Sequence, residues 1–244
     1  RAPTTPQLER ARPLGRCAAH WAHAGRVGSM SYAVSSHRPE VNSLNIRESC
    51  PCIPWRCELR DGTAAVVTWM EERDVPEAAA AFAKVVADGL YWPFEEPLDE
   101  AAFASYWCQN ASLVLRVEEG TGASEMVGMF YVKPNYPGRC AHVCNGGFVT
   151  VPAHRGRGAA SLMGRAFLYV ARQLNYKTSV FNLVFANNTA SMRVWDGLGF
   201  TRAGVIPRAG RLEGCAKLVD AIVYTYDLTT LPLHAAIPAA PAPR

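Results

Sequence analysis

The chain of 244 residues is long enough for one large domain or two small ones, since a domain commonly spans ~100–200 residues. A hydrophobic fraction of 49% is that of an ordinary globular protein and excludes a disordered chain. No apolar run approaches the ~20 residues that a bilayer span needs, so we expect no membrane helix.

The net charge of +4 is concentrated at the N-terminus. Residues 1–47 contain seven arginines and two glutamates, which leaves the remaining chain with a net charge of −1. A neutral body with a basic extension is not typical of a nucleic-acid-binding domain, so we expect no nucleic-acid partner. The Arg-rich, acid-poor extension has two open interpretations, a solvated arm or an organellar transit peptide. The expected location is therefore the cytoplasm or an organelle, either mitochondrion or plastid.

Cysteines are the next feature that bears on function, and the chain has eight of them. Cys50, Cys52 and Cys57 cluster, but their spacing lacks a fourth ligand and no histidine of a zinc site follows nearby. An isolated cysteine inside a large domain behaves as a small apolar residue. We therefore expect reduced structural thiols and no metal.

Three regions are expected along the chain. Residues 1–60 show weak periodicity and are predicted to form a basic, weakly ordered extension. Residues 230–244 form a tail rich in proline and alanine, which holds neither helix nor strand. The domain between them is expected over residues 63–229, a usual size for one domain.

The first half of this domain predicts strands and helices in alternation. A β-rich run over residues 64–70 precedes a helix that Asp74 caps and that extends to Ala87. The aromatic segment over residues 89–97 is expected to be a loop, either surface packing or a wall of an acceptor site. A short helix over 99–107 and strands over 113–117, 126–132 and 143–151 complete this half, the first two strands joined by a hairpin turn.

In the second half the period of the apolar residues changes to that of a helix, over residues 158–174. A buried strand is predicted over 179–185 and a second helix over 188–198, capped by its first residue. Last strands are expected at 205–206 and 221–226. This order of elements predicts a mixed α/β fold.

A short glycine-containing loop, Arg155 to Gly158, lies between a predicted strand and a predicted helix. Small residues let successive backbone N–H groups turn inward, and the helix N-terminus adds partial positive charge, so this loop can hold a pyrophosphate. The guanidinium groups of Arg155 and Arg157 can assist. The loop is neither a P-loop nor a dinucleotide fingerprint, because the Gly-Lys-Ser/Thr sequence and the third glycine are missing.

Two segments resemble the acetyl-CoA-binding motifs of the GCN5-related N-acetyltransferase (GNAT) superfamily. The pattern P-x-x-R-G-x-G matches Pro152 to Gly158, and N-x-x-A-x-x-x-Y-x-x-x-G-F matches Asn188 to Phe200 with serine for alanine and Trp195 for tyrosine. The resemblance implies the GNAT fold, a mixed sheet of about seven strands flanked by about four helices, with acetyl-CoA as co-substrate. The cofactor-binding residues that it implies are Phe148, Val149, Thr150, Arg155, Gly156, Arg157, Gly158, Ala159, Ala160, Ser161 and Asn188.

Residues 130–148 and 179–185 resemble more closely the fungal N-acetyltransferases that act on the proline analogue azetidine-2-carboxylate. This resemblance implies that the backbone of Phe148 faces the thioester and that Asn188 reaches the sulfur. An alternative role of Asn145 is to bridge a sheet edge. The acceptor-binding residues that the resemblance implies are Asn145, Asn182 and Leu183, the last two through their backbone.

Acetyl transfer to an amine needs a polarised carbonyl, a stabilised thiolate and a deprotonated nucleophile. A backbone N–H near Phe148 can polarise the carbonyl, and the two glycines before it would permit a bulge that frees such groups. Trp195 cannot give up a proton usefully, so Asn188 is the remaining donor to the sulfur unless it is only a helix cap. For the base, His142, a water chain and direct binding of the neutral amine are all open.

We therefore expect an N-acetyltransferase that transfers acetyl from acetyl-CoA, in a ternary complex, to the amine of an amino acid or proline-like imino acid. Two alternatives stay open: a protein or peptide N-acetyltransferase, and a non-catalytic acyl-CoA-binding scaffold domain. The expected partner is a small-molecule amine, with homodimerisation left open and no membrane involved.

Overall fold

The computed structural model describes residues 46–109, 111–118, 124–233 and 236–237. The expectations for the basic extension up to residue 45, for the turn at 119–123 and for most of the C-terminal tail lie outside these residues. The described chain forms an eight-stranded sheet in the order β1-β2-β3-β4-β5-β6-β8-β7. The strands are β1 (Trp55–Glu58), β2 (Ala64–Trp69), β3 (Ala111–Glu118), β4 (Ser124–Pro134), β5 (Val143–Thr150), β6 (Thr178–Phe185), β7 (Thr201–Gly210) and β8 (Val219–Asp227).

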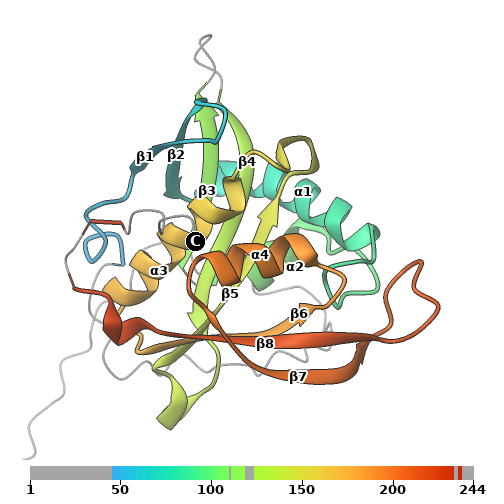
Figure 1. The fold of residues 1–244 in the computed structure, drawn as a ribbon. Helices are drawn as coiled ribbons and strands as arrows, with labels where there is room; N and C mark the ends of the chain where they lie inside the picture. Colours follow the sequence, from blue (N-terminus) through green and yellow to red (C-terminus); the bar gives the residue numbers. More distant parts are fainter. Residues whose placement is uncertain (1–45, 110, 119–123, 234–235, 238–244) are drawn as a thin grey trace, which may run out of the picture.

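Four α-helices cover the two faces of the sheet (Figure 1). They are α1 (Val75–Ala87), α2 (Glu100–Trp107), α3 (Ala159–Gln173) and α4 (Thr189–Gly197). The helices α3 and α4 lie on the face turned toward the viewer in Figure 1, and α1 and α2 lie behind the sheet. The predicted mixed α/β class and the helix count are confirmed, and the sheet has one strand more than the expected seven.

That extra strand is β1, which the sequence placed in a weakly ordered extension. It pairs antiparallel with β2, from Trp55 opposite Val67 to Glu58 opposite Ala64. Cys50 and Leu59, on either side of it, are buried in the core. The folded region therefore begins before the predicted limit at residue 63. The sequence did not indicate this strand because four residues are too few to show a reliable two-residue period.

The first two helices begin in different ways. The side chain of Asp99 caps α2 by accepting a hydrogen bond from the N–H of Ala102 at 2.7 Å. Asp74 precedes α1 but makes no side-chain cap. Its carboxylate is buried and instead accepts a hydrogen bond from Arg116 on β3 at 2.9 Å, which fixes α1 to the sheet.

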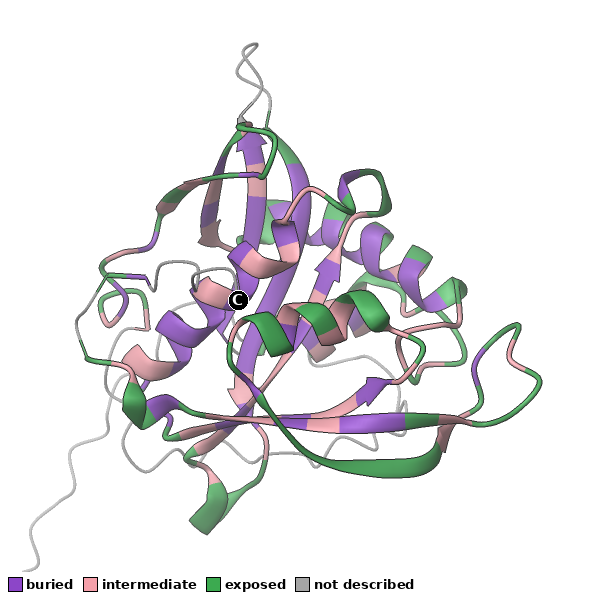
Figure 2. Ribbon diagram, viewed as in Figure 1, coloured by how far each residue is buried: buried purple, intermediate pink, exposed green. Residues whose placement is uncertain are grey.

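Two apolar cores lie on opposite faces of the sheet. The core under α3 and α4 includes Phe130, Phe167 and Phe181, and the core under α1 and α2 includes Phe82 and Trp107. Figure 2 shows the central strands and the inner sides of the helices as buried, and most of the edge strand β7 as exposed. Because β4 and β5 contribute to both cores, their positions depend on packing from both sides.

The parallel strands β5 and β6 pair over a very short length. Val143 lies opposite Thr178 and Cys144 lies opposite Ser179, and no further register pair joins the two strands. Both strands continue, β5 to Thr150 and β6 to Phe185. Figure 1 shows the consequence: β2 to β5 lie roughly vertical in the view, with neighbours antiparallel, whereas β6 to β8 lie across the molecule.

A substitution of Gly128 on β4 tests how tightly β4 and β5 are packed. A Cβ there would lie 2.6 Å from the carbonyl oxygen of Val149, a backbone atom that cannot move without disturbing β5. We expect Gly128→Ala to lower the free energy of unfolding by about 1–3 kcal/mol. Gly204→Ala on β7 is the matched control, because a Cβ there meets nothing within 4 Å. Equal urea-denaturation midpoints for the two variants would contradict this account.

Candidate active site

β5 and β6 diverge after Cys144 and Ser179, and we call the space between them the opening. Backbone N–H groups of β5 face this opening. The N–H of Val151 donates to the carbonyl of Val127, the residue before Gly128 of β4, so the N–H groups of alternate residues before it also face β4. The N–H groups of Phe148 and Thr150 therefore point the other way, toward the side from which β6 has departed. This direction supports Phe148 as a carbonyl-polarising donor, whereas the N–H of Val149 faces β4.

The expected bulge at Gly146 and Gly147 is absent, because β4 and β5 keep one continuous register from Gly128 to Pro134. The two glycines instead make room for aromatic rings. A Cβ on Gly146 would lie 2.6 Å from the ring of Phe167, and a Cβ on Gly147 would lie 2.6 Å from the ring of Tyr131. The prediction that both positions require glycine is consistent with this packing, but the predicted reason, a bulge, is wrong.

The glycine loop leads from β5 into the 15-residue helix α3. Gly156 has φ of 80° and Gly158 has φ of 88°, conformations that residues with a Cβ rarely adopt. Gly158 occupies the N-cap position and offers no side chain there, so the first N–H groups of α3, from Ala159, remain without a capping side chain. Such N–H groups at the end of a long helix suit a phosphate.

The two arginines of the loop have different surroundings. Arg157 donates to Asp61 at 2.7 Å and to Thr63 at 2.9 Å, both in the turn between β1 and β2. This hydrogen bond lowers the pKa of Asp61 well below its usual range, so the ion pair persists at neutral pH. The side chain of Arg157 therefore braces the loop against the N-terminal hairpin, and its predicted contact with a pyrophosphate would have to replace these bonds.

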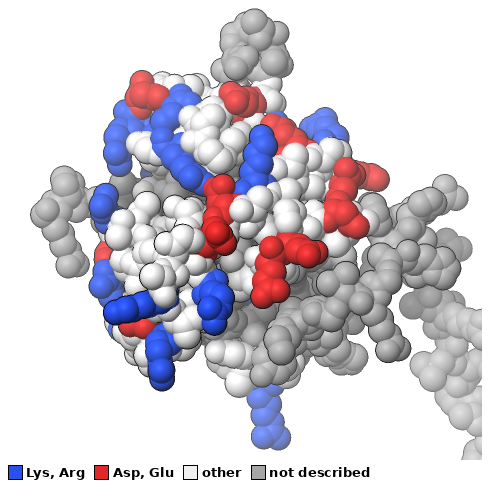
Figure 3. Space-filling view, turned by 90° about the vertical axis from the view of Figure 1, so that its right-hand side faces the viewer, with Lys and Arg blue, Asp and Glu red and all other residues white. Residues whose placement is uncertain are grey.

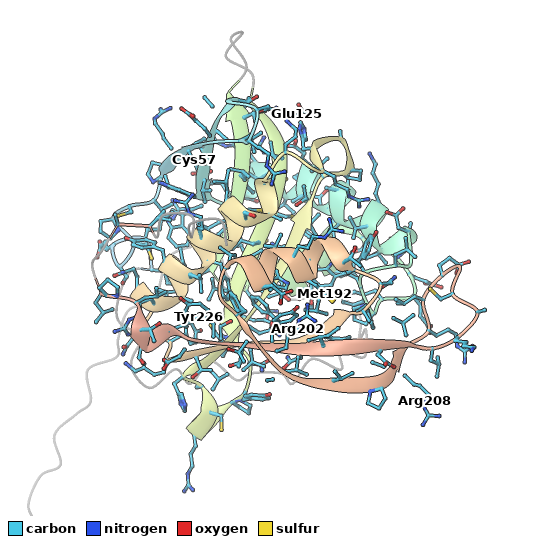
Figure 4. All side chains as sticks on the ribbon, in the orientation of Figure 1. Cys57, Glu125, Met192, Arg202, Arg208 and Tyr226 are labelled. Atoms are coloured by element: carbon cyan, nitrogen blue, oxygen red, sulfur yellow. The ribbon has the colours of Figure 1, made fainter. Side chains whose placement is uncertain are left out.

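Arg157 also contacts His154, which in turn contacts Glu125 of β4. The Nη1 of Arg157 lies 2.8 Å from Nδ1 of His154, whose Nε2 lies 2.9 Å from the carboxylate of Glu125. Glu125 stands near the upper end of β4 in Figure 4. Arg155, by contrast, is half-exposed, 3.8 Å from Asp88, and is the arginine freer to approach a bound anion.

The second motif, residues 188–200, includes α4, with Asn188 at its N-cap and Trp195 within the helix. The Oδ1 of Asn188 accepts a hydrogen bond from the N–H of Ser191 at 3.1 Å, which caps the helix and leaves Nδ2 as a donor. Trp195 is buried, and its ring centroid lies 4.7 Å from that of Phe148. Its indole Nε1 meets no hydrogen-bond acceptor among the described residues. The helix thus spans from β6 to β5, with Asn188 just beyond the end of β6.

The residues expected to contact the acceptor lie on neighbouring strands. The Oδ1 of Asn145 on β5 accepts a hydrogen bond from the N–H of Gly146 at 2.7 Å, so Nδ2 is its remaining donor. Asn182 and Leu183 fall where the register between β6 and β8 shifts, so their backbones have no partner residue in β8. The side chain of Asn182 makes two hydrogen bonds with that of Asn135, of 2.6 and 3.0 Å, which leaves its backbone for the predicted role.

The aromatic loop over residues 89–97 packs beside this region. Trp92 lies against Gly147 of β5, since a Cβ on that glycine would be 2.7 Å from the indole. The ring of Tyr106 on α2 lies edge-on to Tyr131 on β4, and their hydroxyl groups are 3.2 Å apart. Burial raises the pKa of both tyrosines above the usual range, so both phenols are neutral. Trp92 and Phe94 also pack against Phe82 of α1, so the loop belongs to the core on this face, and its role as an acceptor wall stays a prediction.

Lys133 on β4 is a residue to which sequence reasoning gave no role. It lies opposite Asn145 in the register of β4 and β5, and its ammonium is 5.0 Å from the ring centroids of Tyr106 and of Tyr131. Burial lowers the pKa of Lys133. The segment that contains Lys133 and Asn135 was noted for its resemblance, but no spacing rule identifies either residue.

The structure does not bring His142 to this place. It is exposed in the turn before β5, at the end where β5 and β6 are paired. Phe148 follows it by six positions along an extended strand, a path of ~20 Å. Two of the predicted explanations therefore remain: a water chain removes the proton of the amine, or the amine binds in its neutral form.

Cys50, Cys52 and Cys57 are free thiols in the structure. Burial raises the pKa of Cys50 to about 12 and that of Cys57 to about 11, so both are protonated at neutral pH. Among the described residues, no three histidine, cysteine or acidic side chains gather as metal ligands do. In the same part of the chain, no helix combines the length and apolar character that crossing a bilayer requires.

Comparison with known proteins agrees with this geometry. Residues 80–200 match the acetyltransferase (GNAT) family. The N-acetyltransferase aca1 of Schizosaccharomyces pombe is 52% identical over 108 residues, which are 44% of this chain and 52% of that protein. Protein SPT10 of Saccharomyces cerevisiae is 35% identical over 105 residues, 43% of this chain and 16% of its own. The chain thus spans about half the length, or less, of these curated relatives.

Solved structures share the fold over a larger part of the chain. A GCN5-related N-acetyltransferase from Kribbella flavida superposes with a TM-score of 0.61 at 25% identity, over 67% of this chain and 97% of its own. A phosphinothricin acetyltransferase from Sinorhizobium meliloti, solved in complex with acetyl-CoA, superposes with a TM-score of 0.61 at 17% identity, over 71% of this chain and 96% of its own. The predicted GNAT fold is confirmed.

The cap at α4 gives a stability prediction. Asn188→Ala removes the acceptor for the N–H of Ser191 and should lower the free energy of unfolding by about 1 kcal/mol. Asn188→Asp keeps a cap oxygen and should unfold within about 0.5 kcal/mol of the unmodified chain. Denaturant unfolding followed by circular dichroism measures both. A loss in Asn188→Asp as large as in Asn188→Ala would contradict the cap.

Proposed function

We propose that this chain contains a GNAT acetyltransferase domain, as the match over residues 80–200 supports, and that it transfers the acetyl group of acetyl-CoA to the amine of a small amino or imino acid. One observation carries the proposal: β5 and β6 separate after two residue pairs, beside the N–H of Phe148. The glycine loop follows β5 and Asn188 follows β6, so both motifs flank the same opening. Homologous N-acetyltransferases and acetyl-CoA-bound relatives of the same fold add support.

The residues around the opening fit acetyl-CoA. The N–H groups of the loop and of the first turn of α3 would hold the pyrophosphate, and Gly156 leaves open space where a Cβ would stand. The diverging backbones of β5 and β6 offer unpaired N–H and carbonyl groups to the amides of the pantetheine arm. The half-exposed guanidinium of Arg155 would add positive charge near the phosphates.

Acetyl-CoA supplies a thioester: the amine nitrogen bonds to its carbonyl carbon, the carbon–sulfur bond breaks, the sulfur leaves with the electron pair, and the nitrogen loses a proton. The N–H of Phe148 would donate to the carbonyl oxygen, where negative charge develops. The Nδ2 of Asn188 would donate to the departing thiolate, since Trp195 is buried and holds its proton. His142 lies far from Phe148, so we propose that the neutral amine binds directly or that water removes the proton.

The surroundings of Asn145 support a small acceptor. Gly147, two residues after Asn145 on β5, lies beside Trp92 of the aromatic loop, which narrows the approach along β5. The face shown in Figure 3 carries basic and acidic side chains interspersed with uncharged surface. A mixed surface of this kind does not favour the basic peptides that protein acetyltransferases of this fold would attract to an acidic groove.

Binding of acetyl-CoA gives the first functional prediction. A ligand at ~100 times its Kd stabilises the folded state by about 2.7 kcal/mol, which corresponds to a rise of roughly 5–10 °C in Tm. Gly158→Asp should abolish this rise, because it sets a carboxylate against the pyrophosphate. Gly138→Asp is the matched control, since Gly138 also has positive φ and open space but lies outside the loop. Differential scanning fluorimetry measures both variants, and an undiminished shift in Gly158→Asp would refute the loop assignment.

Kinetics separate the roles of the two asparagines. Asn188→Ala should lower kcat by roughly ten- to a thousand-fold, the scale of losing one transition-state donor, with little change in the Kd of acetyl-CoA. Asn188→Asp should fold normally and be nearly inactive, because its carboxylate repels the developing thiolate. Asn145→Ala should raise the KM of the acceptor more than it lowers kcat. A thiol-release assay checks each variant; near-normal turnover in Asn188→Asp would return that residue to a purely structural role.

A further inference from the structure

Lys133 is a half-buried cation that the proposed chemistry leaves without a role. Its ammonium lies 5.0 Å from the centres of two aromatic rings, those of Tyr106 and Tyr131. Among the described residues, none of the ion pairs includes Lys133. Both phenols are neutral, so the positive charge is stabilised by ring faces and not by an anion.

A second donor stands directly across from this cation. Lys133 on β4 lies opposite Asn145 on β5. Since Tyr131 and Gly147 are the next residues on the same side of these strands, and Trp92 and Tyr131 meet at Gly147, both side chains belong to the α1–α2 face of the sheet. The Oδ1 of Asn145 already accepts the N–H of Gly146, so its Nδ2 is the remaining donor.

These two donors together suit one ligand group. An ammonium and an amide N–H₂ on neighbouring strands can each donate to one oxygen of a carboxylate. An anion held beside a partly desolvated ammonium gains more than it would in water, because the effective dielectric constant is lower. The surrounding aromatic rings supply no competing acceptor of full negative charge.

We propose that Lys133 is the specificity-determining residue of the acceptor site, binding the carboxylate of an α-amino or α-imino acid together with Asn145. The inference rests on the proposed acetyl transfer, because it places the acceptor beside the same strand β5 that carries Phe148. It adds the residue that recognises the carboxylate, and it predicts that amines without a carboxylate are poor substrates.

Lys133 could alternatively serve as the base that takes the amine's proton, and the two roles give different kinetics. A carboxylate partner affects the binding of acceptors that carry a carboxylate and leaves other amines unaffected. A base affects the turnover of every amine, whether or not it carries a carboxylate. Matched acceptors that differ by this one group therefore separate the two roles.

The experiment compares L-proline with pyrrolidine, and azetidine-2-carboxylate with azetidine, in a thiol-release assay with acetyl-CoA. Lys133→Met keeps an unbranched apolar side chain against the two tyrosine rings and removes the charge. We expect it to raise the KM of the two acids by roughly ten- to a hundred-fold and to change kcat/KM of the two carboxylate-free amines less than twofold. Lys133→Arg should recover part of the loss. Lys84→Met, on the exposed side of α1, is the control and should change neither.

Calorimetric titration of L-proline into the protein saturated with coenzyme A provides a readout independent of turnover. Binding at least tenfold weaker in Lys133→Met supports the proposal. Equal binding by the two proteins, no binding by the unmodified chain, or equal losses for acids and carboxylate-free amines would overturn it. If the unmodified chain releases no thiol with any amine, the acetyl-transfer proposal fails, and the titration still decides the role of Lys133.

Discussion

The candidate active site depends on the separation of two parallel strands that start as neighbours. β5 and β6 share two residue pairs and then diverge, because β6 turns to pair with β8 while β5 stays with β4. The backbone groups that a continuous sheet would satisfy are thereby left for a ligand. Polar backbone with no partner is costly when it is buried, so a bound molecule that supplies hydrogen bonds is stabilised there.

Packing on both faces keeps the strands apart. On one face Trp195 and Phe181 lie against Phe148, with ring centroids 4.7 and 5.6 Å from it. On the other face Trp92 and Tyr131 occupy the space that Gly147 leaves. Tryptophan at a position where many family members have tyrosine thus has a packing role here. In the proposed reaction Trp195 offers no acidic hydroxyl to the sulfur, and the amide of Asn188 would be the donor to it.

The glycine loop and the acceptor side are fixed by contacts that are distant in sequence. Arg157 and Asp61 are 96 residues apart, and their ion pair attaches the loop to the hairpin of β1 and β2. Asn135 and Asn182 are 47 residues apart and hold the connection after β4 against β6. These contacts make the N-terminal hairpin and the segment after β4 part of the site's support, although neither belongs to a recognisable motif.

These long separations in sequence explain which parts of the molecule could be predicted from the sequence and which could not. The mixed α/β fold, the helices after Gly158 and Asn188, and the loop that precedes the first of them follow from local periods and turn residues. The short strand at Trp55, the bracing by Asp61 and the pairing of Lys133 with Asn145 depend on register across the sheet, which one sequence does not show. His142 lies just before β5, and the direction of that strand places it at the end where β5 and β6 are paired.

A crystal structure of the chain with coenzyme A and an amino-acid acceptor tests the central claim most directly. The account predicts the pyrophosphate on the backbone N–H groups of residues 156–160, the sulfur between the N–H of Phe148 and the side chain of Asn188, and the pantetheine arm between β5 and β6. Coenzyme A bound elsewhere, with no ligand atoms between these two strands, would contradict it.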